Sequence, residues 1–142
     1  MEPYEKALSI SDDEENFEEI FNLLTKAHEQ KDYRATYAIA TWYLNGKFVK
    51  KDLQQATNYL ELAAKNHVSE SQYDLAVSYE EGIGVDRNVN EAFKLYIKAS
   101  LNGDLQSIYE VGRCFYHGIG VNQNTDVANT FLSIAEEKGI TE

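Results

Sequence analysis

Residues 73–85 read YDLAVSYEEGIGV, and residues 109–121, 36 positions later, read YEVGRCFYHGIGV. The same shift places residues 37–49, YAIATWYLNGKFV, in register with both. Three stretches that align at one fixed spacing in a chain of 142 residues indicate tandem copies of a single structural unit. We therefore take this repeat as the feature that decides the fold.

The columns that repeat are of the kind that packs helices together. The aligned triplets are Tyr37, Tyr73 and Tyr109; Ala40, Ala76 and Gly112; Tyr43, Tyr79 and Phe115; Ala56, Ala92 and Ala128; Leu60, Tyr96 and Leu132; and Ala63, Ala99 and Ala135. Two helices cross closely only where one presents a small residue. We therefore expect the Ala40 column to mark the contact between the two helices of each unit.

Within a unit the apolar residues have helical spacing. Ala92, Leu95, Tyr96 and Ala99 follow the i, i+3, i+4, i+7 pattern of one helix face. Three pairs have the spacing of capping boxes, namely Asp52 with Gln55, Ser69 with Gln72 and Asn88 with Glu91. Glycines stand where helices should end, at positions 46, 82, 103, 118 and 139. Each unit is therefore predicted to be a helix A, a glycine-bearing turn and a helix B.

Residues 12–30 match a helix B alone under the same shift. Ser11 and Glu14 have the spacing of a capping box, and acidic residues crowd positions 12–19. A terminal helix with a polar outer face is what a helical stack needs as a cap. We expect no helix A before it.

Together these patterns predict an all-α protein, a right-handed α-solenoid of about seven helices in one domain over residues 1–142. The domain comprises a capping helix (12–31) and three repeats (32–67, 68–103 and 104–139). The predicted helices span 12–30, 33–45, 53–66, 70–81, 89–102, 105–117 and 125–138.

The net charge is −11, from 13 basic and 24 acidic residues. A chain this acidic repels nucleic-acid phosphates and anionic lipid surfaces, so neutral or basic proteins are its expected partners.

Residues 1–5 carry no leader signature, and no stretch is apolar enough to span a membrane. The single cysteine, Cys114, has no partner for an internal disulfide. We expect a cytoplasmic location, although a secreted effector with a non-classical signal would look the same.

The residues at the turn and on both helices resemble those of the Sel-one-like repeat (SLR) family, relatives of the tetratricopeptide repeats. The pattern consists of Tyr73, Leu75, Ala76, Tyr79, Gly82, Gly84, Val85, Ala92, Ala99 and Gly103. The first unit departs from it at the turn 46–49, which reads GKFV, and at His67, which replaces the closing glycine. The resemblance implies an adaptor or scaffold.

In the related repeats, the second, fifth, ninth and twelfth positions of helix A line the concave face. By that resemblance the partner-binding residues are Arg34, Tyr37, Thr41 and Leu44 in the first unit, Glu70, Tyr73, Val77 and Glu80 in the second, and Gln106, Tyr109, Arg113 and Tyr116 in the third. We expect Arg34, Arg113 and Tyr116 to be exposed. For Tyr37, Tyr73 and Tyr109 the alternative is packing between successive A helices.

No group of residues in the sequence has the spacing of a catalytic or metal site. The three histidines are scattered, and Cys114 lies on a predicted helix A without a base beside it, which indicates a quiet, half-buried thiol. Trp42 is expected to pack in the core; the alternative is an anchor at a binding interface. We predict neither an enzyme nor a cofactor.

Two functions remain open. The first is an adaptor that binds a protein or peptide in its concave groove. The second is a small acidic inhibitor or immunity protein that neutralises a basic toxin or nuclease. We also expect weak self-association through the C-terminal helix, because Phe131 and Ile134 should be left partly bare there.

Overall fold

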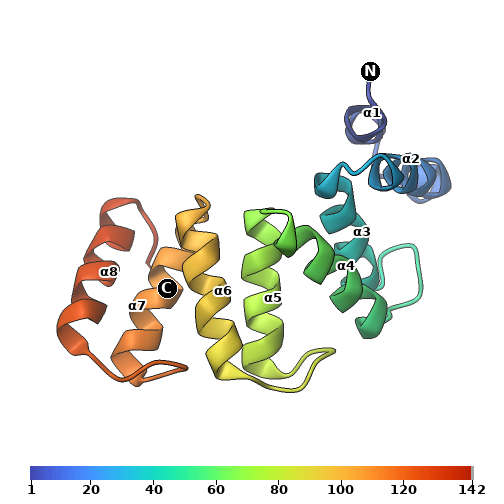
Figure 1. Cartoon of the computed structure of the whole chain (residues 1–142). Helices are drawn as coiled ribbons and strands as arrows, with labels where there is room; N and C mark the ends of the chain where they lie inside the picture. The colour runs from blue at the N-terminus through green and yellow to red at the C-terminus, as the bar shows by residue number, and fades with distance from the viewer. Residues whose placement is uncertain (142) are drawn as a thin grey trace. The chain divides into compact units, whose positions relative to one another are not determined.

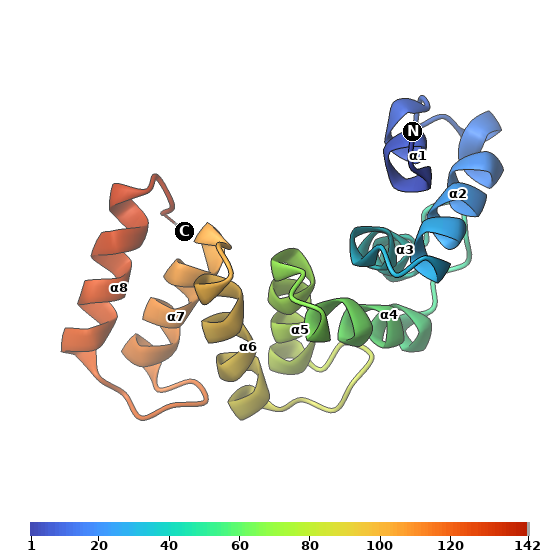
Figure 2. The ribbon, with the colours of Figure 1, turned by 45° about the horizontal axis from the view of Figure 1, so that its top comes forward.

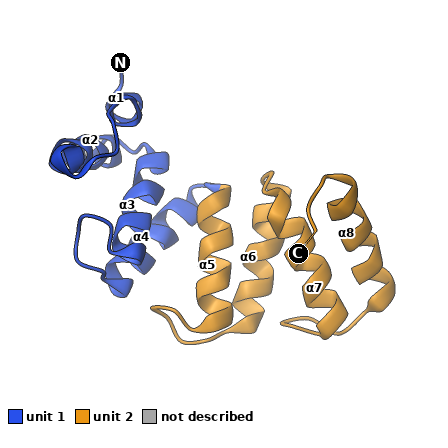
Figure 3. Cartoon of the chain, turned by 180° about the vertical axis from the view of Figure 1, so that it is seen from behind, with its two compact units in different colours: residues 1–68 blue, residues 69–142 orange. Residues whose placement is uncertain are grey.

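The computed structural model describes residues 1–141, and its regular structure is entirely helical (Figure 1). The chain divides into two compact units, Met1–Val68 and Ser69–Glu142 (Figure 3). The predicted all-α solenoid is confirmed; that the repeats form one domain stays a prediction. No helix within residues 1–141 is both long and apolar enough to cross a bilayer.

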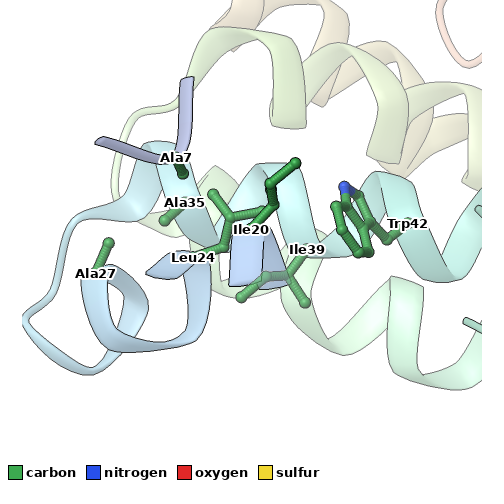
Figure 4. Close-up of a cluster of buried hydrophobic side chains, with 7 residues drawn as sticks. All are labelled: Ala7, Ile20, Leu24, Ala27, Ala35, Ile39 and Trp42. Carbon is green, nitrogen blue, oxygen red and sulfur yellow. The ribbon is translucent and has the colours of Figure 1, made fainter. Parts of the chain in front are cut away.

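The first unit holds four α-helices, each of which packs on the next (Figure 2). They are α1 (Pro3–Ser9), α2 (Phe17–Glu29), α3 (Tyr33–Asn45) and α4 (Leu53–Lys65), with a 3-10 turn, η1 (Glu14–Asn16), before α2. A cluster of buried apolar side chains joins α1, α2 and α3, and consists of Ala7, Ile20, Leu24, Ala27, Ala35, Ile39 and Trp42 (Figure 4). Trp42 is 6% exposed, so its predicted place in the core is confirmed.

The second unit repeats the arrangement with α5 (Ser69–Glu81), α6 (Val89–Leu101), α7 (Leu105–His117) and α8 (Thr125–Glu137). Helices α5 and α6 form one hairpin, α7 and α8 form the next, and α6 packs on α7. The small column behaves as predicted, because Ala76 is fully buried and a Cβ added to Gly112 would lie 2.9 Å from the side chain of Leu132 on α8.

Two of the three capping boxes predicted in the repeats are half formed; at the third, Ser69 lies inside α5 and its hydroxyl donates to the Glu70 carboxylate. Asp52 accepts from the amides of Gln54 and Gln55, and Asn88 accepts from the amide of Glu91. The backbone amides of Asp52 and Asn88 do not donate to the side chains of Gln55 and Glu91; they donate to the carbonyls of Tyr43 and Tyr79, at 3.0 and 2.8 Å. These bonds tie the start of helix B to the helix A before it.

The first-repeat turn reaches the same backbone conformation without the family's glycine. Phe48 has φ of 60°, against 72° and 67° at Gly84 and Gly120. Its ring stacks on Phe17 with centroids 5.2 Å apart. His67 likewise adopts φ of 66° where Gly103 has 95°.

The N-terminus corrects two predictions. A helix does precede the expected cap, since Pro3–Ser9 form α1 and its Ala7 is buried against α2 and α3; the described residues therefore form eight α-helices, not seven. The cap itself begins at Phe17, not at position 12. Ser11 donates to the Asp13 carboxylate and does not cap a helix. The other predicted helix bounds lie within one residue of those observed.

Candidate functional site

The eight predicted residues of the second unit lie on α5 and α7, and each keeps some exposure to solvent. They are Glu70, Tyr73, Val77 and Glu80 on α5, and Gln106, Tyr109, Arg113 and Tyr116 on α7. The structure joins the two sets directly, because the Glu80 and Arg113 side chains meet. We call this surface the α5–α7 face.

A polar network lies at the centre of the α5–α7 face. Arg113 Nη1 and Nη2 donate to Glu80 Oε2 and Oε1 at 3.0 and 2.7 Å, and Nη2 also donates to Glu110 Oε2 at 3.1 Å. From α6, the Tyr96 hydroxyl donates to Glu80 Oε1 at 2.9 Å. The fork-shaped guanidinium thus holds α5 and α7 together in one relative position.

Burial and hydrogen bonding act in opposite directions on the pKa of Glu80, the central carboxylate of this network. Burial would raise the pKa of Glu80, but the hydrogen bonds from Arg113 and Tyr96 outweigh it and hold that pKa below its ordinary value. Burial and the Glu80 carboxylate raise the pKa of the Tyr96 hydroxyl well above its usual range. The Glu80 carboxylate and the Arg113 guanidinium therefore remain ionised at neutral pH, and Tyr96 remains a donor.

Arg113 is more buried than expected. Its side chain is 26% exposed and its guanidinium is engaged by two carboxylates, whose side chains are 18% and 12% exposed. Breaking a pair of this kind is costly, since it leaves charge uncompensated in a poorly solvated place. Arg113 therefore organises the face and does not present a free cation to a partner.

The tyrosines flank this network with part of each ring open to solvent. Tyr73 meets the ring of Tyr96 edge-on at 5.9 Å, and burial raises the pKa of its hydroxyl. Tyr109 is half-buried, and Tyr116, at the end of α7, is 45% exposed. Tyr73 thus packs partly on helix B of its own hairpin while keeping an exposed edge.

The four predicted residues of the first unit lie on α3. Arg34 is exposed, as expected, but its guanidinium donates to Asp32 and Glu5 and lies over the ring of Tyr4, 4.3 Å from the centroid. Thr41 Oγ1 donates to a carbonyl of its own helix. Tyr37 and Leu44 are half-buried.

Sequence reasoning missed two members of the network. Glu110 is 9% exposed, although a charged residue on a helix surface is ordinarily solvated. Tyr96 was predicted as core because Leu60 and Leu132 share its column, and it is 1% exposed, but its hydroxyl has a polar role that the column does not reveal. The i, i+3 spacing of Glu110 and Arg113 was the available signal.

Two other side chains able to do chemistry, Cys114 and His28, are buried or hydrogen-bonded. Cys114 is fully buried, more than predicted, and burial raises the pKa of its thiol to about 12, so the nucleophilic thiolate is scarce at neutral pH. His28 Nδ1 pairs with Thr36 Oγ1 at 2.8 Å. Residues 1–141 contain no cluster of three or more histidine, cysteine or carboxylate side chains fit to hold a metal ion.

Comparison with known proteins finds the same repeat. The sequence profile of the Sel1 repeat family matches residues 34–67, 69–104 and 105–140. A Sel1 repeat protein from Oxalobacter formigenes superposes with a TM-score of 0.84 at 26% identity, over 96% of this chain and 55% of that one. No curated protein matches the sequence.

Two further solved structures are similar. The first is c5321, a protective antigen present in uropathogenic Escherichia coli strains that displays an SLR fold; its TM-score is 0.83 at 29% identity, over 85% of this chain and 26% of that one. The second, Helicobacter pylori cysteine rich protein B (hcpB), shares the fold with a TM-score of 0.68 at 20% identity, over 92% and 93% of the two chains. This chain thus spans less than two thirds of the Oxalobacter and Escherichia coli proteins.

Proposed function

We propose that this chain, which belongs to the Sel1 repeat family of protein-interaction scaffolds, binds a segment of another protein on its α5–α7 face. Members of the family are generally non-enzymatic. We further propose that the protein has no catalytic role of its own and works in the cytoplasm. The other predicted groove residues lie on α3 of the first unit, and their part in binding stays a prediction.

The observation that carries this proposal is the Glu80–Arg113 bridge between the two helices. It fixes the backbone beneath Tyr73 and Tyr109, so these rings need little further ordering when a partner binds. Half-exposed tyrosines offer both apolar area and a hydroxyl, which is the chemistry of interface hot spots. The expected ligand is an extended or helical segment with apolar and hydrogen-bonding anchors.

The test replaces the rings and leaves the bridge in place. Tyr73→Ala and Tyr109→Ala should each weaken binding of the natural partner, captured from the host and then purified, by about 2 kcal/mol. Tyr73→Phe and Tyr109→Phe are the matched controls, and should retain most of the affinity. Folded alanine variants that bind as tightly as the wild type would show that this face is not the site.

Net charge favours a second candidate, an inhibitor of a basic toxin or nuclease. A charge of −11 on 142 residues suits fast capture of a cationic protein. The distinguishing measurement is the activity of the purified partner. An inhibitor abolishes that activity at one-to-one stoichiometry, whereas an adaptor leaves it intact.

A further inference from the structure

The first unit contains an apolar pocket of about 230 Å³ between α1, α2 and α3. Ile20 and Leu24 of α2, Leu8 of α1, and Ala38 and Trp42 of α3 line it. Three of these side chains, Ile20, Leu24 and Trp42, belong to the core cluster (Figure 4), so the pocket opens directly onto the core of the unit. Leu8 stands beside it with 67% of its surface exposed.

This pocket occupies the register position of the polar network in the second unit. Helices α1, α2 and α3 correspond to the end of α5, to α6 and to α7 at a shift of two repeats, 72 residues. The corresponding pairs are Leu8 with Glu80, Leu24 with Tyr96, Ala38 with Glu110, Thr41 with Arg113 and Trp42 with Cys114.

The comparison explains why one position is closed and the other open. In the second unit, long polar side chains reach across between two A helices and bond to one another. In the first unit most of the corresponding side chains are shorter. The Thr41 hydroxyl donates to a carbonyl of its own helix, and Ala38 has only a methyl group, which can form no such bond. The space that the network fills is therefore left as a pocket with apolar walls.

We propose that this pocket takes one large apolar side chain of a partner protein, and that lysine or arginine residues flank that side chain in the partner. The inference deepens the proposed function, on which it rests, by naming an anchor point and a partner chemistry. The pocket is smaller than the 300–1,000 Å³ of usual small-molecule sites, which fits a single side chain. Anchors seated in such pockets commonly dominate an interface.

The basic flanks follow from the charge at the mouth of the pocket. Asp12 and Lys47 both line the pocket and form an ion pair with each other. Asp13, Glu14 and Glu15 come next along the chain and are all exposed. The charges of Asp12 and Lys47 cancel, and the three exposed carboxylates that follow Asp12 in the chain make the adjoining segment negative, which attracts cationic side chains at close range.

The chain carries its own reporter for a test, since Trp42 is its only tryptophan and lines the pocket. The probe is an acetylated, amidated pentapeptide, Lys-Lys-Phe-Lys-Lys, titrated into the whole protein while the indole N–H resonance of Trp42 is followed by NMR. We expect a saturable shift of this resonance. Alanine in place of the phenylalanine, or glutamates in place of the lysines, should each weaken binding by about tenfold or more.

Protein variants assign the shift to the pocket. Ala38→Leu should fill it and weaken the peptide about tenfold, while Asn58→Leu, at an exposed site of α4 in the same unit, should leave binding unchanged. If Ala38→Leu does not fold, Leu8→Ser at the exposed wall replaces it, with weaker binding expected again.

Three results would overturn the proposal: no movement of the Trp42 resonance, equal affinity for the alanine peptide, or pocket variants that bind the peptide as tightly as the wild type. Equal affinity for the glutamate peptide would overturn the assignment of a basic partner. Tyr73 and Tyr109 report on the second unit and Trp42 on the first, so a failure of this proposal can be distinguished from a failure of the proposed function.

Discussion

The turn between helix A and helix B has phenylalanine at one position in the first unit and glycine at the same position in the second. Both residues adopt a positive φ, so the difference between them lies in the side chain. A Cβ at Gly120 would lie 2.1 Å from the carbonyl oxygen of Val89, so only glycine fits. Two repeats earlier, Phe48 and Phe17 take the places of Gly120 and Val89, and there the rings stack. A left-handed phenylalanine is strained, and the stacking offsets that strain.

This difference predicts unequal effects for two glycine substitutions. Gly103→Ala should cost about 1–2 kcal/mol, because its φ of 95° is unfavourable for alanine but a Cβ meets no atom within 4 Å. Gly120→Ala should cost about 4 kcal/mol or more, since it adds a backbone clash to the same strain. Urea unfolding of both variants measures the difference. Similar losses would mean that the turn relaxes away from Val89.

At the scale of elements, the repeat predicted six of the eight α-helices, α3 to α8, to within one residue at each end, because each of these helices is defined by columns that contact its neighbours. α1 was missed because it has no complete repeat before it and covers only seven residues. The acidic run at 12–19 was interpreted as a helix start, although the shift of 36 from Leu53 already placed that start at Phe17. Here local charge was a poorer guide than register.

Another element-scale feature, the bridge between α5 and α7, makes stability depend on pH in a predictable direction. The folded-state pKa of Glu80 lies below its ordinary value of 4.5, so its stabilising contribution is present above that pH and is lost as the pH falls through the folded-state pKa. Arg113→Met removes the hydrogen bond and the charge that Arg113 supplies, and burial stays the largest single influence on Glu80, so we expect the pKa of Glu80 to rise. The Glu80 contribution then falls as the pH rises above 4.5.

We therefore expect Arg113→Met to lose about 2 kcal/mol at pH 7 and less at pH 4, somewhat below the 3–5 kcal/mol of a fully buried pair because Arg113 keeps 26% exposure. Lys94→Met, which removes an exposed pair with Glu91, is the control and should cost under about 0.5 kcal/mol. Chemical denaturation at the two pH values tests this. A deficit that does not change with pH would contradict the assigned titration.

The last helix carries the expected apolar surface in part. Phe131 stacks on Phe115 with centroids 5.9 Å apart, whereas Ile134 is 37% exposed. We predict weak self-association through α8, which Ile134→Ser should abolish while changing the free energy of unfolding by less than about 0.5 kcal/mol. Sedimentation velocity over a range of concentrations measures both proteins. A wild type that stays monomeric throughout would refute this prediction.

For the molecule as a whole, the sequence predicts fold much better than site. The register placed Tyr73, Tyr109, Glu80 and Arg113 on two A helices. The burial of Glu110, and the bridge between Glu80 and Arg113, which are 33 residues apart in the sequence, depend on how α5 and α7 approach each other. The pocket beside Trp42 could not be predicted from the sequence either, because it arises where side chains are too short to fill the space between α1, α2 and α3. Periodicity predicts which helix faces pack together, but it does not predict how completely side chains fill the space between those faces.

Charge is the whole-molecule property with the clearest kinetic consequence. Residues 1–31 hold nine acidic and three basic side chains, so this segment alone supplies −6 of the net charge of −11. We predict that raising salt from about 20 to 150 mM slows association with the natural partner by about tenfold and changes dissociation little, because screened charges act on the encounter. Tyrosine substitutions on the α5–α7 face should show the opposite pattern and speed dissociation.

A charge-neutralising variant makes this prediction specific. Replacing Asp12, Asp13, Glu14 and Glu15 by their amides should flatten the dependence of the association rate on salt, while the protein keeps its helical spectrum. The matched control neutralises four exposed acids elsewhere, namely Glu61, Glu81, Glu136 and Glu137, with the same change in net charge. If both variants respond to salt alike, only total charge matters and the N-terminal run has no steering role. If association with the wild type ignores salt, the partner is not basic, and the mouth of the Trp42 pocket is not where it first makes contact.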